Sequence, residues 1–286
     1  MANCKADLLE IASPPLAKKT STRKRKRLPA WCRPTFSPEH GVLLVLLGSF
    51  LTGASLAQQW NSSTNLALVC AFFTLQLEHP YVVQLKQRKN IKPRFMLWGG
   101  IYGAIALSLA ILLWFKAPVL LWIYLLAITI FIADGVAVIL KKHKSIANEV
   151  IGFAGISLSA PLAYGATTGS ISWEAMGIWI LNTLFFSSAI YTIKLRRKKT
   201  HSLKPGIIYH GISTTIIAGL YGFSCLSLVT ALSFAVALVK FGTVNLVLDW
   251  YRKSKFQFIA IFETRFALVY IAIACISVLP AHLPPR

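Results

Sequence analysis

The sequence predicts an all-α, polytopic membrane protein with about nine transmembrane helices. Hydrophobic residues make up 56% of the 286-residue chain and charged residues only 14%, whereas soluble domains average about 25% charged residues. Several uncharged runs reach the roughly 20 residues that a helix needs to cross the hydrocarbon core. In addition, Lys and Arg gather at every second loop between the apolar runs. These three observations predict a helix bundle embedded in a bilayer.

The nine apolar stretches differ in what their residues imply about packing. The fifth contains Pro161, which we expect to kink the helix and free carbonyl groups that must find partners inside the bundle. The fifth and sixth carry small residues such as Gly152, Gly155 and Ser187, which allow close helix contact. Ser224-Cys225-Leu226 leaves room only for a tight turn between the seventh and eighth. The expected spans are residues 41–58, 64–84, 96–115, 118–140, 147–167, 173–194, 207–225, 227–248 and 260–279.

The distribution of positive charge predicts the orientation. Of 30 Lys and Arg residues, 26 lie in the N-terminal tail and in four loops, at Lys86–Arg94, Lys141–Lys144, Lys194–Lys204 and Arg252–Lys255. The intervening loops hold only Lys116. Because Lys and Arg remain on the cytoplasmic side, the N-terminus is expected inside and the C-terminus outside.

Three regions follow from this pattern. Residues 1–36 are expected to form a disordered basic cytoplasmic tail, residues 37–280 the transmembrane domain, and residues 281–286 a short C-terminal tail. The net charge of +21 and the run Arg23–Arg27 would suggest nucleic acid or a nuclear signal in a soluble protein. Beside a membrane span, anchoring on anionic lipids is the better explanation, so we expect membrane lipids and no nucleic acid as partners.

Ionisable residues within membrane spans are functional candidates because they are expensive to bury. Most of those in this chain fall near the basic ends of their helices, which suggests one cavity facing the cytoplasm. The alternative is that individual residues reach water by snorkelling, which is at least as plausible for Glu39, Asp249 and Glu263. The candidate cavity residues are His40, Glu78, His79, Asp134, Glu149, Tyr191, His210 and Lys240.

Three of these residues allow specific expectations. Asp134 is too short to snorkel easily, so we expect a buried role, with Lys240 as a conceivable ion-pair partner. Glu149 begins the fifth span, where it either complements the positive helix end or belongs to the site. His210 could titrate near neutral pH, although a lone His is more often a hydrogen-bonded packing residue.

The sequence contains no metal-binding or nucleotide-binding motif, and the five cysteines lie far apart. We therefore predict no metal site, no disulfide framework and no cofactor. The basic end of the sixth span, with Lys194, Arg196 and Arg197, is a candidate anion site. Lipid headgroups are its expected partner, and a phosphorylated substrate is the alternative.

Three segments resemble the YwiC-like family of bacterial membrane proteins. They are Ser37-Pro38-Glu39-His40-Gly41, Asn148-Glu149-Val150-Ile151-Gly152 and Ser159-Ala160-Pro161, and the likeness runs over most of residues 37 to 280. The resemblance implies a multi-pass protein of the bacterial inner membrane and brings no established function with it.

A more distant likeness, best from Lys141 to Lys199, is to the UbiA prenyltransferase superfamily. It implies nine helices and a site that opens to the cytoplasm. In that superfamily, Asp-rich motifs at the ends of helices 2 and 6 hold the Mg²⁺ that binds an isoprenoid diphosphate. The corresponding segments here, Leu77–Tyr81 and Ala189–Lys194, contain no aspartate. Mg²⁺ binding and standard prenyl transfer are therefore not expected, although the basic cluster could contact phosphate instead.

Three functions remain open at this point. The first is binding or modification of an amphipathic, isoprenoid-like lipid in a cavity that faces the cytoplasm, which the one-sided clustering of acids and histidines favours. The second is a small-solute or proton-coupled transporter that uses Asp134, Lys240 and Glu149. The third is a membrane assembly protein without a ligand. Whether the protein is an enzyme is left open.

Overall fold

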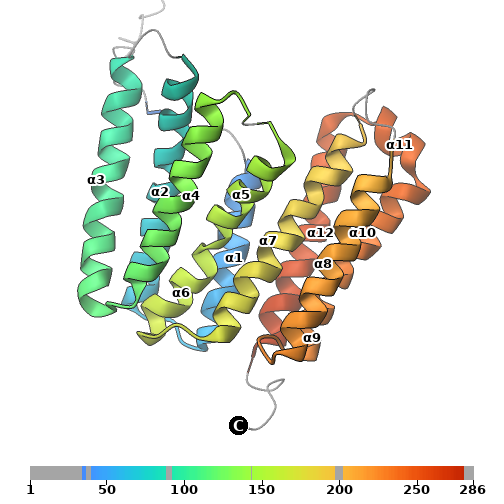
Figure 1. Ribbon diagram of the computed structural model, residues 1–286. Helices are drawn as coiled ribbons and strands as arrows, with labels where there is room; N and C mark the ends of the chain where they lie inside the picture. The colour runs from blue at the N-terminus through green and yellow to red at the C-terminus, as the bar shows by residue number, and fades with distance from the viewer. Residues whose placement is uncertain (1–33, 37–39, 88–91, 143, 197–201, 280–286) are drawn as a thin grey trace, which may run out of the picture.

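The computed structural model describes residues 34–36, 40–87, 92–142, 144–196 and 202–279. Within these residues the chain forms twelve helices and no strand, and most helices run roughly parallel or antiparallel to one another (Figure 1). The predicted all-α membrane bundle is confirmed. The helices are α1 His40–Ala57, α2 Ser62–Gln87, α3 Pro93–Lys116, α4 Leu120–Ile139, α5 Ile146–Ser157, α6 Ser159–Thr168, α7 Trp173–Lys194, α8 Lys204–Gly222, α9 Leu228–Leu232, α10 Ala235–Leu246, α11 Leu248–Lys253 and α12 Phe256–Ser277.

Each predicted span corresponds to one helix or to two consecutive helices. The fifth span is divided into α5 and α6 and the eighth into α9 and α10, while the short α11 was not expected. Among the described residues, seven stretches are long and apolar enough to cross a membrane: α2, α3, α4, α5 with α6, α7, α9 with α10, and α12. The apolar part of α1 is shorter. The protein is thus a multi-pass integral membrane protein.

The break between α5 and α6 lies three residues before Pro161. Proline has no backbone N–H and its ring crowds the carbonyl four residues earlier, so a continuous helix is disfavoured there. Hydrogen bonds join the residues around the break to the neighbouring helices α7 and α1. The Trp179 indole N–H donates to the carbonyl of Ala154 at 2.8 Å, and the Ser159 hydroxyl donates to the carbonyl of Leu46 at 3.0 Å. The expected kink is therefore present as a break inside the bundle.

Helix α1 packs against helices from both the earlier and the later part of the chain. Its Val45 belongs to an apolar cluster formed mainly with α7 and α12, whereas Leu46 and Phe50 belong to a cluster formed with α2 and α6. The approach to α6 is very close, because a Cβ atom on Gly53 would overlap the backbone carbonyl of Ala160. Helix α1 thus joins an N-terminal half, α2 to α6, to a C-terminal half, α7 to α12.

If α5 with α6 and α9 with α10 are each taken as one span, successive spans alternate in direction, so the connections gather at two ends (Figure 1). One end holds the termini of α2 and α3, of α4 and α5, and of α7 and α8, together with α11. All four basic loops of the sequence belong to this end, which we call the basic end. At the opposite end, Ser224 adopts a φ of +58° and its N–H donates to the carbonyl of Tyr221. This is the predicted tight turn after α8.

We expect Gly53→Ala to lower the free energy of unfolding by about 1–3 kcal/mol, because the added methyl group meets backbone rather than a movable side chain. Thermal unfolding of the detergent-purified protein measures the effect. The control is Gly211→Ala on α8, where a Cβ atom has no neighbour within 4 Å. Equal stability of the two variants would contradict the close crossing of α1 and α6.

Candidate functional site

A long groove lies in the N-terminal half and has a volume of about 590 Å³. This lies within the range of about 300–1,000 Å³ that is typical of ligand pockets. Its walls come from α1 to α6 and are mostly aliphatic and aromatic. Representative lining residues are Leu46, Leu75, Leu107, Ile111, Trp114, Leu121, Ile128, Phe131, Gly152, Ile156 and Leu162, and the only charged residues of the described lining are Glu78 and Asp134.

Glu78 and Asp134 lie in the part of the long groove that is nearer to the basic end of the bundle. Trp114 and Leu121 lie toward the opposite end of the bundle. From Leu121 to Asp134 helix α4 rises about 20 Å, which gives the length of the apolar wall. Several polar side chains along this wall already donate to backbone carbonyls: Thr74 to Cys70 at 2.8 Å, Tyr124 to Ala110 at 3.2 Å, and Ser159 to Leu46. The groove is therefore apolar along its length and acidic at one end.

Asp134 is held in place by the start of α5. Its Oδ1 accepts a hydrogen bond from Nδ2 of Asn148 at 2.6 Å. The backbone N–H of Asn148 in turn donates to Oγ of Ser145, the residue that caps α5. Asn148 is buried and Asp134 half-buried. The carboxyl group of Asp134 is thus positioned by an amide rather than by a cation.

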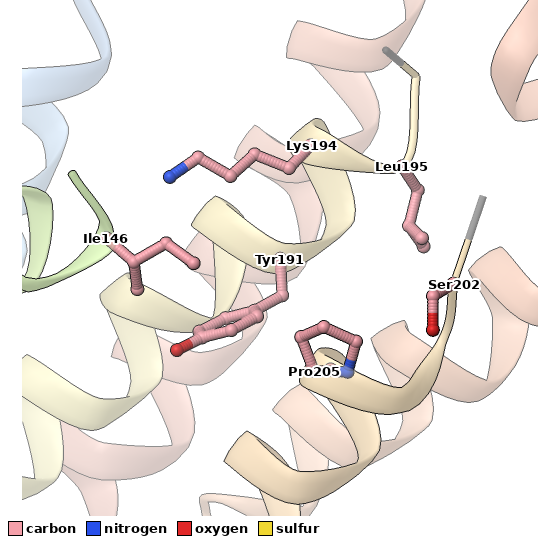
Figure 2. Close-up of a pocket in the computed structure, with 7 residues that line it drawn as sticks. Ile146, Tyr191, Lys194, Leu195, Ser202 and Pro205 are labelled. Carbon is pink, nitrogen blue, oxygen red and sulfur yellow. The ribbon is translucent and has the colours of Figure 1, made fainter. Parts of the chain in front are cut away.

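Glu149 and Lys194 form an ion pair that joins α5 to α7, with 2.7 Å between Oε2 and Nζ. Glu149 also lies in the first turn of α5. Its carboxylate therefore complements the partial positive charge of the helix N-terminus in addition to pairing with Lys194 on another helix. The Lys194 side chain extends alongside Tyr191, at a small cavity of about 50 Å³ that Ile146 also lines (Figure 2). The ring of Tyr191 stacks on that of Tyr209, with 4.3 Å between centroids.

The C-terminal half contains a buried polar network centred on Glu263. Its Oε2 accepts from Nζ of Lys240 at 2.9 Å, and its Oε1 accepts from the hydroxyl groups of Thr192 at 2.7 Å and Tyr251 at 3.0 Å. We call these four residues the Lys240 network. Burial raises the pKa of the Tyr251 phenol and the charge of Glu263 raises it further, so this hydroxyl remains a donor. The expectation that Lys240 pairs with Asp134 is wrong, because α12 supplies its carboxylate.

His210 packs beside this network and away from the long groove. Its ring stacks on Phe241, with 4.4 Å between centroids, and Nδ1 lies 2.7 Å from the carbonyl oxygen of Gly206. The structure therefore places His210 and Lys240 in one half, and Glu78 and Asp134 in the other. Sequence reasoning left open whether Glu263 belongs to a site or reaches water by snorkelling, although an acid and a base within neighbouring apolar spans were a signal for this pair.

The remaining candidates lie at the basic end. His40 begins α1, and His79 is half-buried next to Glu78 on α2. The guanidinium of Arg196 donates to the carbonyl of Ser254 and lies over the ring of Phe256. Arg197 is outside the described residues, among which no group of three or more His, Cys, Asp or Glu side chains is arranged to hold a metal ion.

We expect Lys240→Met to lower the stability by about 3–5 kcal/mol, because the largely buried carboxylate of Glu263 loses its cation. Lys194→Met, in the more exposed pair, should cost at most about 1 kcal/mol. The double variant Lys240→Met/Glu263→Gln should recover most of the loss, since Gln still accepts from Thr192 and Tyr251. Thermal unfolding in detergent measures all three, and equal losses for the two single variants would contradict the buried pair.

Comparison with known proteins supports the resemblance seen in the sequence. Residues 36–164 match the family model described as YwiC-like protein. The match contains the three motif segments and ends within α6, so it does not reach the C-terminal half that the sequence likeness included. Neither a curated protein nor a solved structure matches the chain significantly, and the likeness to UbiA enzymes therefore rests on the sequence motifs alone. From residue 36 to residue 164, somewhat less than half of its length, the chain is therefore similar to the YwiC-like family.

Proposed function

We propose that this membrane protein binds an amphipathic lipid in the long groove. The apolar chain of the lipid, isoprenoid-like in character, lies along α3 and α4, and the polar head lies near Glu78 and Asp134. All lining residues of the groove fall between Leu46 and Leu162, inside the part of the chain that matches the YwiC-like family. The proposal thus assigns the function to the N-terminal half.

One observation carries the proposal, namely the separation of apolar and acidic lining along a single groove. An apolar wall of about 20 Å fits an extended hydrocarbon chain. The two carboxyl groups at one end favour a fixed direction for the bound molecule, because a polar head is stabilised there and an apolar chain is not. A water-soluble ligand would gain little from the rest of the lining.

We also propose that the basic end faces the cytoplasm of a bacterial cell, with the protein in the inner membrane. The support is the concentration of Lys and Arg in the loops of this end. In this orientation the N-terminus is inside, the C-terminus is outside, and the lipid head is presented to the cytoplasm.

The transporter alternative receives less support from the contacts. A path through Asp134, Glu149 and Lys240 requires these residues to lie close together, whereas each makes a different contact. Asp134 accepts from Asn148, Glu149 pairs with Lys194, and Lys240 pairs with Glu263. The contacts favour separate positioning roles over a shared transport path.

The orientation can be tested by labelling cysteines in intact cells. In a background in which all five native cysteines are replaced by Ser, a membrane-impermeant maleimide should label Ser170→Cys and should label Lys142→Cys only after permeabilisation. Both positions are exposed and lie at opposite ends of the bundle. The reverse labelling pattern would overturn the proposed orientation.

Lipid extraction and mass spectrometry test the binding function. We expect the purified protein to carry one enriched amphiphile above the bulk phospholipid. Gly152→Leu should deplete it, because Gly152 lines the groove and its Cβ position is open, so the new side chain can occupy ligand space without a clash at Cβ.

The matched control is Gly211→Leu, which adds the same side chain at an open, exposed position in the other half. Both changes replace a helical glycine and improve helix propensity equally. If the wild-type protein carries only bulk phospholipid, in the same proportions as Gly152→Leu, the binding proposal is wrong.

A further inference from the structure

The lining of the long groove also indicates the chemical class of the head, an inference that rests on the proposed function. Among its described lining residues are two carboxyl groups and no Lys, Arg or His. We infer that the bound amphiphile has a single chain and a cationic, amine-type head, and that an anionic phosphate or diphosphate head is disfavoured.

The polar contacts around the head end support a cation. Asp134 accepts from an uncharged amide, so its charge is not neutralised by that contact. A second acidic residue, Glu78, lines the groove from α2, so an ammonium group between α2 and α4 would have acidic groups on two sides. Charge-assisted hydrogen bonds of this kind are roughly twice as strong as neutral ones.

Two lysines that are at least half-buried form ion pairs with acids outside the groove. Lys194 pairs with Glu149, and Lys240 pairs with Glu263 in the other half. Lys141 and Lys142, which follow α4, are exposed and lie about 10 Å beyond Asp134 along the helix direction. A phosphate at the level of Asp134 would therefore meet negative charge first.

The dimensions favour one chain. The groove offers about 590 Å³ along an apolar wall of about 20 Å, and Trp114 lines the end opposite the acids. A chain whose head lies at Asp134 therefore brings its methyl end toward Trp114. This geometry provides an optical readout, because bromine atoms near the methyl end would quench the fluorescence of this tryptophan.

The experiment compares three probes with the same long chain, brominated near the methyl end, which carry a primary amine, an alcohol or a phosphate monoester. Each is titrated into the detergent-purified protein, and the specific signal is the quenching that disappears in Trp114→Phe. We expect the amine to bind about fivefold more tightly than the alcohol, and the phosphate to bind most weakly.

Two conservative variants assign this preference to the acids. Glu78→Gln and Asp134→Asn should each reduce the preference for the amine over the alcohol at least twofold, and together should abolish it. Binding of the alcohol should persist, which shows that the groove remains folded. Asp249→Asn, in α11 of the other half, is the matched control and should leave all three affinities unchanged.

The outcomes separate the two proposals. If the alcohol or phosphate binds as tightly as the amine, or the variants leave the preference intact, the inference about the head is wrong while lipid binding stands. If no probe gives quenching that depends on Trp114, or brominated phosphatidylcholine quenches as strongly, the groove holds no specific amphiphile and both proposals fail.

Discussion

The structure depends on the close crossing of α1 over the broken segment formed by α5 and α6. In a bilayer, backbone groups freed by a helix break have no water to bond, so protein must surround them. Helix α1 covers the break on one side, where Gly53 approaches Ala160 and the Leu46 carbonyl accepts from the Ser159 hydroxyl, and α7 covers it on the other, where the Trp179 indole donates to the Ala154 carbonyl. Both halves of the bundle are therefore positioned by this crossing.

The two halves differ in how their charged side chains are paired. In the C-terminal half, the charge of Glu263 is neutralised within the protein, because Glu263 accepts hydrogen bonds from Lys240, Thr192 and Tyr251. In the N-terminal half, acidic groups line a groove that is otherwise apolar. A satisfied network holds helices together, whereas a lining of this kind suits a ligand with a chain and a polar head. Residue 164, where the YwiC-like match ends, lies just before the C-terminal half.

The sequence was sufficient for the features that repeat along the chain. Apolar runs predicted the helices, alternating loop charge predicted which helix ends share one end of the bundle, and Pro161 predicted the disruption of the fifth span. Contacts between helices that lie far apart in the sequence were harder to predict. Lys240 and Glu263 are 23 residues apart on different helices, and their neighbouring spans were only a weak signal, because Asp134 in another span was also a candidate partner. The groove was also hidden, because empty space between helices leaves no residue pattern of its own.

We propose above that the N-terminal half holds one amphiphile in a fixed direction. A structure of the protein in lipid nanodiscs, determined with a bound antibody fragment, measures this directly. We expect a single continuous density along α3 and α4 that begins between Glu78 and Asp134 and ends near Trp114. A groove closed by its own side chains, or filled with separate lipid densities that enter from the bilayer and avoid the two acids, would contradict it.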